Sequence, residues 1–186
     1  MQSKQVCRKA LRRLRRGLPD EARREAEAHI FQNLEALRAD QGARSVGVYA
    51  ALRSEASVWG WAEHVYETTG RCAWPIVTQN TLHFCWASPK DLKRGFRGIR
   101  EPDHRAERAD LASLDMLIVP GLGFGFTGAR LGQGGGFYDR ALTPGRPALV
   151  VGVCFEAQLR EDIPMSEHDQ RMDYLVTGSR TLHCLP

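Results

Sequence analysis

Residues 114–140 read LDMLIVPGLGFGFTGARLGQGGGFYDR, and this stretch decides the fold. Its first seven residues form a short apolar run, which is typical of a strand buried on both faces of a parallel sheet. Residues 120–140 then hold eight glycines, three of them consecutive at 134–136. A buried strand, a glycine-rich loop and a helix that begins near Gly135 together indicate an α/β domain whose ligands bind at the carboxyl ends of the strands.

The segments on either side of this stretch alternate between helix and strand patterns. We expect helices over residues 3–18, 20–40 and 57–69. We expect strands over residues 45–51, 71–77, 81–86, 114–120, 148–155 and, as the last strand, 174–177. Asp20 is expected to cap the second helix, and residues 87–112 to be a loop with short structure. The sequence therefore predicts a three-layer α/β sandwich with a central, mainly parallel sheet flanked by helices, formed by residues 1–186 as a single domain.

The composition is that of an ordinary globular protein, with 42% hydrophobic and 26% charged residues, which excludes disorder. No stretch approaches the roughly 18 apolar residues of a membrane helix, and no apolar segment follows the basic start of the chain. We therefore expect a cytoplasmic protein. The five cysteines are odd in number and lack C-x-x-C spacing, which predicts reduced thiols, and the scattered histidines indicate no zinc site.

The first expected helix is strongly basic. Residues 8–16 contain five arginines and one lysine. At 100° per residue, Lys4, Arg8 and Arg15 fall within about 40° of one another, beside an apolar stripe that includes Leu11. These three side chains are therefore expected to point along one edge of the protein body. Their charge favours anionic partners, whether phosphates, carboxylates or nucleic acid.

The glycine-rich loop predicts a phosphate site. Glycine lets the backbone adopt positive φ and lets a ligand approach the N–H groups, and a run of such groups forms an anion nest. Arg130 and Arg140 flank the loop and would neutralise charge. No Gly-Lys-Ser/Thr follows, so it is not a Walker A loop, and the dinucleotide-binding fingerprint is incomplete. A flexible surface turn is the alternative interpretation.

Four carboxylates are candidates for binding a ligand. Asp139 closes the loop and could reach a magnesium ion held by phosphates, with a second carboxylate from Asp169 or Asp173. Glu55 follows a strand and could accept hydrogen bonds from an amide or a ring N–H. For each of them a helix cap or a surface charge is the alternative.

Four segments in order along the chain resemble the 5-formyltetrahydrofolate cyclo-ligase family, also called methenyltetrahydrofolate synthetases. They are KQVCRKALRRLRRGL (4–18), GVYAALRSEAS (47–57), LDMLIVPGLGFGFTGARLGQGGGFYDRAL (114–142) and VVGVCFEAQLREDIPMSEHDQRMDYLVTG (150–178). The resemblance implies an ATP- and Mg²⁺-dependent conversion of 5-formyltetrahydrofolate to 5,10-methenyltetrahydrofolate, in which ADP and phosphate are released. The formyl oxygen is phosphorylated, and N10 then attacks the activated carbon. Such a transfer depends on positioning and charge neutralisation.

The resemblance also implies residue roles. ATP would be bound by Lys4, Arg8, Arg130, Leu131, Gly132, Gln133, Gly134, Gly135, Gly136, Phe137 and Tyr138. The folate would contact Ala50, Glu55, Gln133, Gly134, Gly135, Gly136 and Phe137, with Phe124 and Tyr138 as aromatic walls. Arg130 and Tyr138 would act in catalysis, Asp139 and Asp169 would hold Mg²⁺, and Arg15 lies on the same basic face.

The loop departs from the family pattern at three positions. Gln133 and Gly135 stand where many members carry Arg or Lys, and Phe137 replaces a common tyrosine. Positive charge must then come from elsewhere. The alternatives that remain are a family member that binds a nucleotide or RNA without cyclo-ligase activity, and an unrelated nucleotide-binding regulator. We expect a monomer with small-molecule substrates and with neither a membrane nor a nucleic-acid partner.

Overall fold

The structure is a computed structural model that describes residues 3–79, 81–95 and 98–184. Within these residues the helices are α1 (Lys4–Arg16), α2 (Asp20–Asp40), α3 (Trp59–Thr69) and α4 (Phe137–Leu142). The strands of the main sheet are β1 (Val46–Gly47), β2 (Ala73–Thr78), β3 (Thr81–Trp86), β6 (Arg108–Ala109), β7 (Met116–Pro120), β10 (Leu149–Val153), β12 (Tyr174–Val176) and β13 (Thr181–His183). Two small sheets are built from β8 (Gly123–Gly125), β9 (Arg130–Leu131) and β11 (Leu159–Arg160), and from β4 (Lys93–Arg94) and β5 (Arg100–Glu101).

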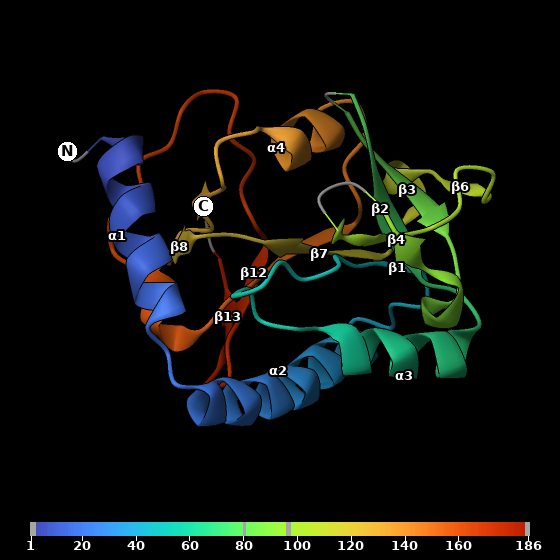
Figure 1. Ribbon diagram of the computed structural model, residues 1–186, viewed down its shortest axis with the longest axis horizontal. Coiled ribbons are helices and arrows are strands. Elements are labelled where there is room, and N and C mark those ends of the chain that lie inside the picture. The colour runs from blue at the N-terminus through green and yellow to red at the C-terminus, as the bar shows by residue number, and fades with distance from the viewer. Residues whose placement is uncertain (1–2, 80, 96–97, 185–186) are drawn as a thin grey trace.

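The main sheet has the strand order β13-β12-β10-β7-β1-β2-β3-β6. Its five central strands, from β12 to β2, pair in parallel, whereas β13, β3 and β6 join its two edges in antiparallel fashion. The sheet is therefore mainly parallel, as the sequence predicted. Figure 1 shows α2 and α3 along one face of this sheet and α4 on the other, which confirms the three layers.

Strand β7 shows why the fold has this form. Met116 and Ile118 pack into the cluster beneath α2 and α3, while Leu117 and Val119 pack into the cluster on the opposite face. Successive side chains of a strand point to opposite faces, so a strand covered on both sides must be apolar at every position. Each such fully buried side chain contributes about 1.5–3 kcal/mol. The apolar run at 114–120 therefore marks the central strand of the sheet, which is covered on both faces.

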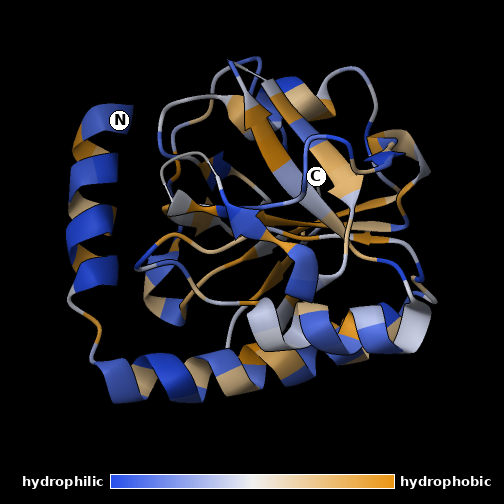
Figure 2. Cartoon of the chain, turned by 45° about the vertical axis from the view of Figure 1, so that its right-hand side comes forward, coloured by the Kyte–Doolittle hydropathy of each residue, from blue (hydrophilic) through white to orange (hydrophobic). Residues whose placement is uncertain are grey.

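Helix α1 lies at one side of the sheet, where Figure 2 shows a mostly hydrophilic helix standing against the body. Leu11 is buried with Leu122, Leu131 and Ile163. It packs directly on the backbone of Gly123, since a Cβ added there would lie 2.6 Å from Leu11 Cδ1. The first half of the glycine-rich segment therefore forms strands β8 and β9 that seat α1, and the second half, from Gly132, is the loop proper.

Several sequence expectations were wrong in detail. Helix α2 is capped by Pro19 without a side-chain hydrogen bond, so Asp20 stands in its first turn, where its charge suits the helix dipole. The strand predicted over 45–51 is only Val46–Gly47. Residues 174–177 do not end the sheet, because the chain turns at Gly178-Ser179 and returns as β13. That Gly-Ser pair between two short β-forming runs was a readable hairpin signal.

The described part of residues 87–113 is mostly loop, with the short strands β4, β5 and β6 and with 3₁₀ turns that include Pro89–Asp91 and Leu111–Ser113, in agreement with the prediction. The five cysteines are reduced thiols, as predicted, and four of them are buried: Cys72, Cys85, Cys154 and Cys184. In the described part of the chain, no helix combines the length and the apolar character that crossing a membrane requires.

Candidate active site

A cavity of about 1210 Å³ opens at the carboxyl ends of the parallel strands, between α1 and the glycine loop. With the exception of Phe124, the residues to which the family resemblance assigned a role line this cavity: Lys4, Arg8, Arg15, Ala50, Glu55, Arg130, Leu131, Gly132, Gln133, Gly134, Gly135, Gly136, Phe137, Tyr138, Asp139 and Asp169. The fold thus brings together four segments that are far apart in the sequence. The individual roles of these residues stay predictions.

The glycine loop offers its backbone to this cavity. Gly134 and Gly136 adopt positive φ values of 107° and 64°. Among the described residues, none accepts a hydrogen bond from the backbone N–H groups of residues 133–136. Residues 133–135 are exposed and line the cavity, so their N–H groups can donate to a ligand that enters it. A row of such N–H groups on glycine backbone is suited to an anion.

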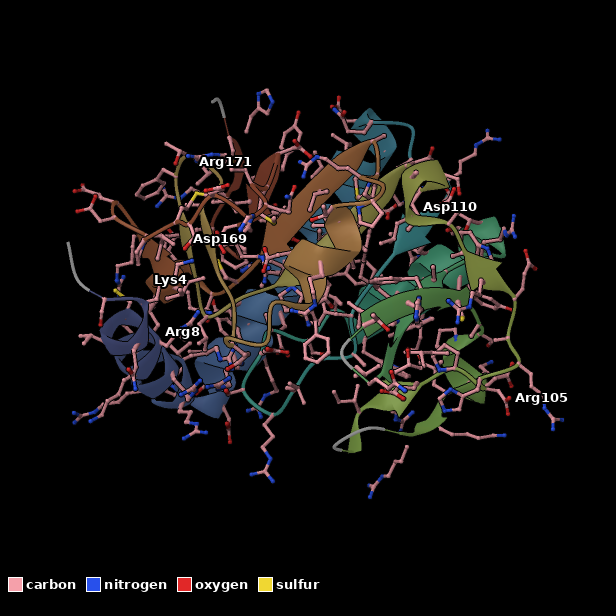
Figure 3. All side chains as sticks on the ribbon, turned by 90° about the horizontal axis from the view of Figure 1, so that it is seen from above. Lys4, Arg8, Arg105, Asp110, Asp169 and Arg171 are labelled. Carbon is pink, nitrogen blue, oxygen red and sulfur yellow. The ribbon has the colours of Figure 1, made fainter. Side chains whose placement is uncertain are left out.

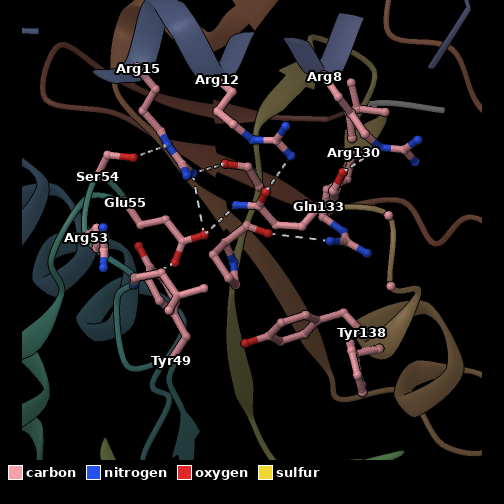
Figure 4. Close-up of a pocket in the computed structure, with 18 of the residues that line it drawn as sticks. Arg8, Arg12, Arg15, Tyr49, Arg53, Ser54, Glu55, Arg130, Gln133 and Tyr138 are labelled. Carbon is pink, nitrogen blue, oxygen red and sulfur yellow. Dashed lines mark hydrogen bonds and ion pairs between the residues drawn. The ribbon is translucent and has the colours of Figure 1, made fainter. Parts of the chain in front are cut away.

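Helix α1 supplies the positive charge that the loop lacks. Arg8 Nε donates to the carbonyl of Gly132 at 3.0 Å, and Arg12 Nη2 donates to Oε1 of Gln133 at 3.1 Å. In Figure 4 both arginines point from α1 toward the loop. Arg12 was not among the predicted site residues. The neutral Gln133 is therefore compensated by a guanidinium from another element.

Two carboxylates lie at the far end of the loop. Asp139 accepts from Arg130 Nη2 at 2.8 Å and from the N–H of Gln170 at 3.2 Å. Its neighbour Asp169 forms an ion pair with Lys4, and these two residues lie together in Figure 3. Burial alone would raise the pKa of Asp169, but the Lys4 ammonium and the Ser166 N–H hold that pKa below its usual value.

These carboxylates suit a metal that is shared with phosphates. Among the described residues no group of three or more His, Cys, Asp or Glu side chains could hold an ion. Magnesium, however, commonly takes one or two protein carboxylates and completes its shell with phosphate oxygens and water. Asp139 and Asp169 fit that pattern. Beside them, Nε of the buried Arg130 has no hydrogen-bond partner within the described chain.

Asp173, the other candidate for a second metal ligand, lies elsewhere. Its carboxylate pairs with Arg146 at 2.7 Å and accepts from the N–H of Val150, also at 2.7 Å. Asp173 therefore ties two elements of the fold together and does not line the cavity. Of the two aspartates, the structure puts only Asp169 at the site.

Glu55 is held by a buried arginine that the sequence analysis treated only as part of a basic face. Oε1 of Glu55 accepts from Arg15 Nη1 and from Gln133 Nε2, both at 3.4 Å, and Oε2 accepts from the N–H of Leu52 at 2.9 Å. Arg15 also donates to Ser54 Oγ at 3.1 Å and to the Gly121 carbonyl at 3.2 Å. Figure 4 shows this network linking α1, the segment after β1 and the glycine loop.

The charge of Arg15 is buried with it. Its exposed fraction is 3%, and burial lowers the pKa of its guanidinium, an effect that Glu55 partly offsets. Arg15 therefore positions Glu55 and the loop. Lys4, Arg8, Arg12 and Arg16 are the other cations of α1 that line the cavity, and Arg8 and Arg12 bond directly to the glycine loop.

The two expected aromatic walls behave differently. Tyr138 lines the cavity, with the Arg130 guanidinium 5.6 Å from its ring centre. Burial and the nearby charge of Glu55 raise the pKa of its hydroxyl, which therefore stays protonated. The prediction that Phe124 forms a wall of the folate site was wrong, because its side chain is fully buried in the core against Gly121 and Gly152. Phe124 is the middle residue of strand β8, between two glycines, and its side chain points into the core. An apolar residue at the centre of a short strand indicates burial, but the glycine-rich composition made this segment look like a loop.

The comparisons with known proteins agree with the geometry. The 5-formyltetrahydrofolate cyclo-ligase from Saccharomyces cerevisiae is 38% identical over 102 residues, which are 50% of this chain and 47% of that protein. The enzyme of the same name from Mycolicibacterium smegmatis is 32% identical over 98% of this chain and 97% of its own length. A solved structure of a 5,10-methenyltetrahydrofolate synthetase from Aquifex aeolicus superposes with a TM-score of 0.87 at 30% identity, covering 98% of this chain and 93% of that one.

The profile of the family described as 5-formyltetrahydrofolate cyclo-ligase matches residues 1–178, nearly the whole chain. The matched range includes α1, the segment after β1, the glycine loop and Asp169, which are the four parts that line the cavity. The chain therefore belongs to the 5-formyltetrahydrofolate cyclo-ligase family of enzymes.

Proposed function

We propose that this protein converts 5-formyltetrahydrofolate and ATP to 5,10-methenyltetrahydrofolate, ADP and phosphate, with Mg²⁺ bound at the phosphates. One observation carries the proposal. The N–H groups of residues 133–136, which have no partner within the described ranges, border a cavity that is also lined by cations of α1 and by two aspartates. Family membership supports the chemistry.

The triphosphate would lie against the glycine loop. The N–H groups of residues 133–136 would donate to phosphate oxygens, and Arg8 and Lys4 would approach from α1. Arg12, fixed on Gln133, adds charge where the loop itself has none. Nε–H of Arg130 has no partner among the residues that the structure describes, and Nη2 bonds to Asp139, so Arg130 would neutralise charge on the transferred phosphoryl group.

Asp139 and Asp169 would hold the magnesium ion together with phosphate oxygens. Bound there, the ion would supply neutralisation of the triphosphate charge. Both carboxylates are paired with cations, Asp139 with Arg130 and Asp169 with Lys4. We therefore expect an exchange of partners on binding, in which Arg130 and Lys4 turn from the carboxylates to the phosphates.

The reaction mainly requires the protein to hold ATP and the folate in the correct relative position. The formyl oxygen attacks the γ-phosphorus and ADP leaves; N10 then attacks the formyl carbon, loses its proton, and phosphate leaves with the oxygen. Held in reacting geometry, these steps need no strong base. Tyr138, protonated and facing the cavity, would act as an aromatic wall and a neutral hydrogen-bond donor. Glu55, next to Gln133, would lie near the formyl end of the folate, where Ala50 lines the same wall.

The test is a spectroscopic assay. Purified protein is mixed with Mg-ATP and 5-formyltetrahydrofolate, and the absorbance of the methenyl product is followed. We expect product that depends on all three components. No product at saturating substrates would refute an active cyclo-ligase and leave the family member without this activity as the alternative. A titration with RNA at two salt concentrations separates the other alternative, since binding through α1 would fall steeply with salt and ignore ATP.

A further inference from the structure

Glu101 is a buried carboxylate, one oxygen of which has no partner in the part of the chain that the structure describes. Its exposed fraction is 4%, and it lines the same cavity as the glycine loop. Within the described chain, Oε1 of Glu101 has no hydrogen-bond partner. Buried carboxylates are costly unless they are paired, and unpaired ones are therefore rare in folded proteins. Neither the sequence analysis nor the proposed chemistry uses this group.

The neighbouring cations do not neutralise it. Lys93 lies opposite Glu101 in the β4–β5 pair, but its ammonium goes to Asp103 at 3.4 Å. Arg100, the preceding residue, stacks its guanidinium over the ring of Trp59 at 4.8 Å. A surface ion pair therefore does not explain the position of this carboxylate.

A glycine makes room for the carboxylate. A Cβ added to Gly95 would lie 2.2 Å from Oε2 of Glu101 and 2.6 Å from its Cδ. The carboxylate thus rests directly on the backbone of the β4–β5 hairpin.

The surroundings are apolar and distant from α1. Ile99, Pro75, Val77 and Leu82 line the cavity in addition to Glu101. They belong to β2, β3 and the β4–β5 hairpin, and Figure 1 shows β4 on the opposite side of the molecule from α1. One part of the cavity is therefore basic and suited to phosphates, while another is apolar with a single carboxylate. The second part fits a flat ring whose edge carries N–H donors.

We propose that Glu101 recognises the 2-amino-4-oxo edge of the folate ring, accepting hydrogen bonds from the ring N–H and from the 2-amino group. Two adjacent N–H donors match the two oxygens of a carboxylate in the same bidentate manner as a guanidinium does. Glu55 is less suited to this edge, because its oxygens already accept from Arg15, Gln133 and the Leu52 N–H. Glu101 would then orient the ring, and Glu55 would stay at the formyl end. This inference rests on the proposed function.

The test is equilibrium binding of 5-formyltetrahydrofolate without ATP, measured by calorimetry on the wild-type chain and three variants. Glu101→Gln keeps the shape of the side chain but replaces one carboxylate oxygen with an NH₂ group. That NH₂ group cannot accept a hydrogen bond from the N–H donors of the folate ring. Gly95→Ala moves the carboxylate. Glu107→Gln is the matched control, because Glu107 is exposed and outside the cavity. We expect roughly 10- to 100-fold weaker folate binding for Glu101→Gln and a smaller loss for Gly95→Ala, with ATP affinity unchanged.

A pair of ring fragments separates recognition from a structural effect. Pterin carries the 2-amino group, and lumazine has an oxygen there. The wild-type chain should prefer pterin, and Glu101→Gln should lose that preference. Unchanged folate affinity in Glu101→Gln would overturn the inference while wild-type turnover still supports the proposed function. If Glu101→Gln lost folate and ATP affinity equally, the inference would also be overturned, because such a result would mean that Glu101 supports the structure of the whole site. A wild-type chain that binds no folate would reject the proposed function and this inference together.

Discussion

Replacing Arg15 with methionine would remove the guanidinium that joins three parts of the site. Arg15 donates to Ser54, to Glu55 and to the carbonyl of Gly121, and its side chain and that of Glu55 are 4% and 6% exposed. Methionine has a similar length and no charge, so the variant keeps much of the packing and removes the pairing. We expect a folded but clearly less stable protein.

The loss of stability in Arg15→Met depends on which hydrogen bonds Glu55 retains. Removing one member of a buried ion pair costs about 3–5 kcal/mol, because the other charge stays buried, and the low exposure here means little screening by solvent. Glu55 retains the Leu52 N–H at 2.9 Å and Gln133 at 3.4 Å, and the Gly121 carbonyl retains Gln158 at 3.1 Å. We therefore expect the lower end, about 3 kcal/mol, which lowers the Tm by about 6–12 °C for a chain of this size.

Thermal denaturation at neutral pH measures this loss. Adding Glu55→Gln to Arg15→Met removes the uncompensated charge, so the double variant should recover about 1–2 kcal/mol relative to Arg15→Met alone. A Tm of Arg15→Met within about 2 °C of the wild type would refute the reasoning. Strict additivity of the two substitutions would do the same, since it would mean that the two side chains do not interact.

Three further outcomes are expected. Asp139→Asn should lower Mg-dependent turnover by roughly 100-fold or more, with the exposed Glu167→Gln as control, and equal turnover in both variants would remove the metal role. The variant should also have a lower unfolding midpoint, because the buried Arg130 loses the charge with which it pairs, so turnover is compared at a temperature where both variants are folded. Gly152→Ala should cost about 1–3 kcal/mol in urea unfolding, because its Cβ would lie 2.5 Å from Phe124; an unchanged midpoint contradicts that packing. The lowered pKa of Asp169 means that its pairing with Lys4 stabilises the fold above about pH 4 and is lost as pH falls through the lower folded value. Lys4→Met should flatten this acid dependence by under about 1 kcal/mol, since both side chains are partly exposed, and parallel stability curves from pH 3 to 6 would exclude the contribution.

The sequence by itself determined the layered fold and the segments of the site. The run at 116–120 is apolar at successive positions because both faces of β7 are covered, and this pattern can be read from the residues of the strand alone. The glycines at 134–136 are equally local, since a positive φ and a close approach to the backbone require them wherever the loop lies. The collinear motifs then placed Glu55, Asp139 and Asp169 at one cavity.

Only the tertiary structure decided what each charged side chain faces. Arg8 and Arg15 lie on the same edge of α1, yet Arg8 meets the loop and Arg15 is buried on Glu55, a residue 40 positions away in the sequence. Helical periodicity records which side of α1 is turned inward and says nothing about which distant residue covers it. The same limit applies to Phe124, which packs against β10, and to Glu101, which lies against Gly95 while Lys93 and Arg100 make their contacts elsewhere. Local pattern fixes backbone form, whereas the partner of a buried charge is fixed only when distant segments pack together.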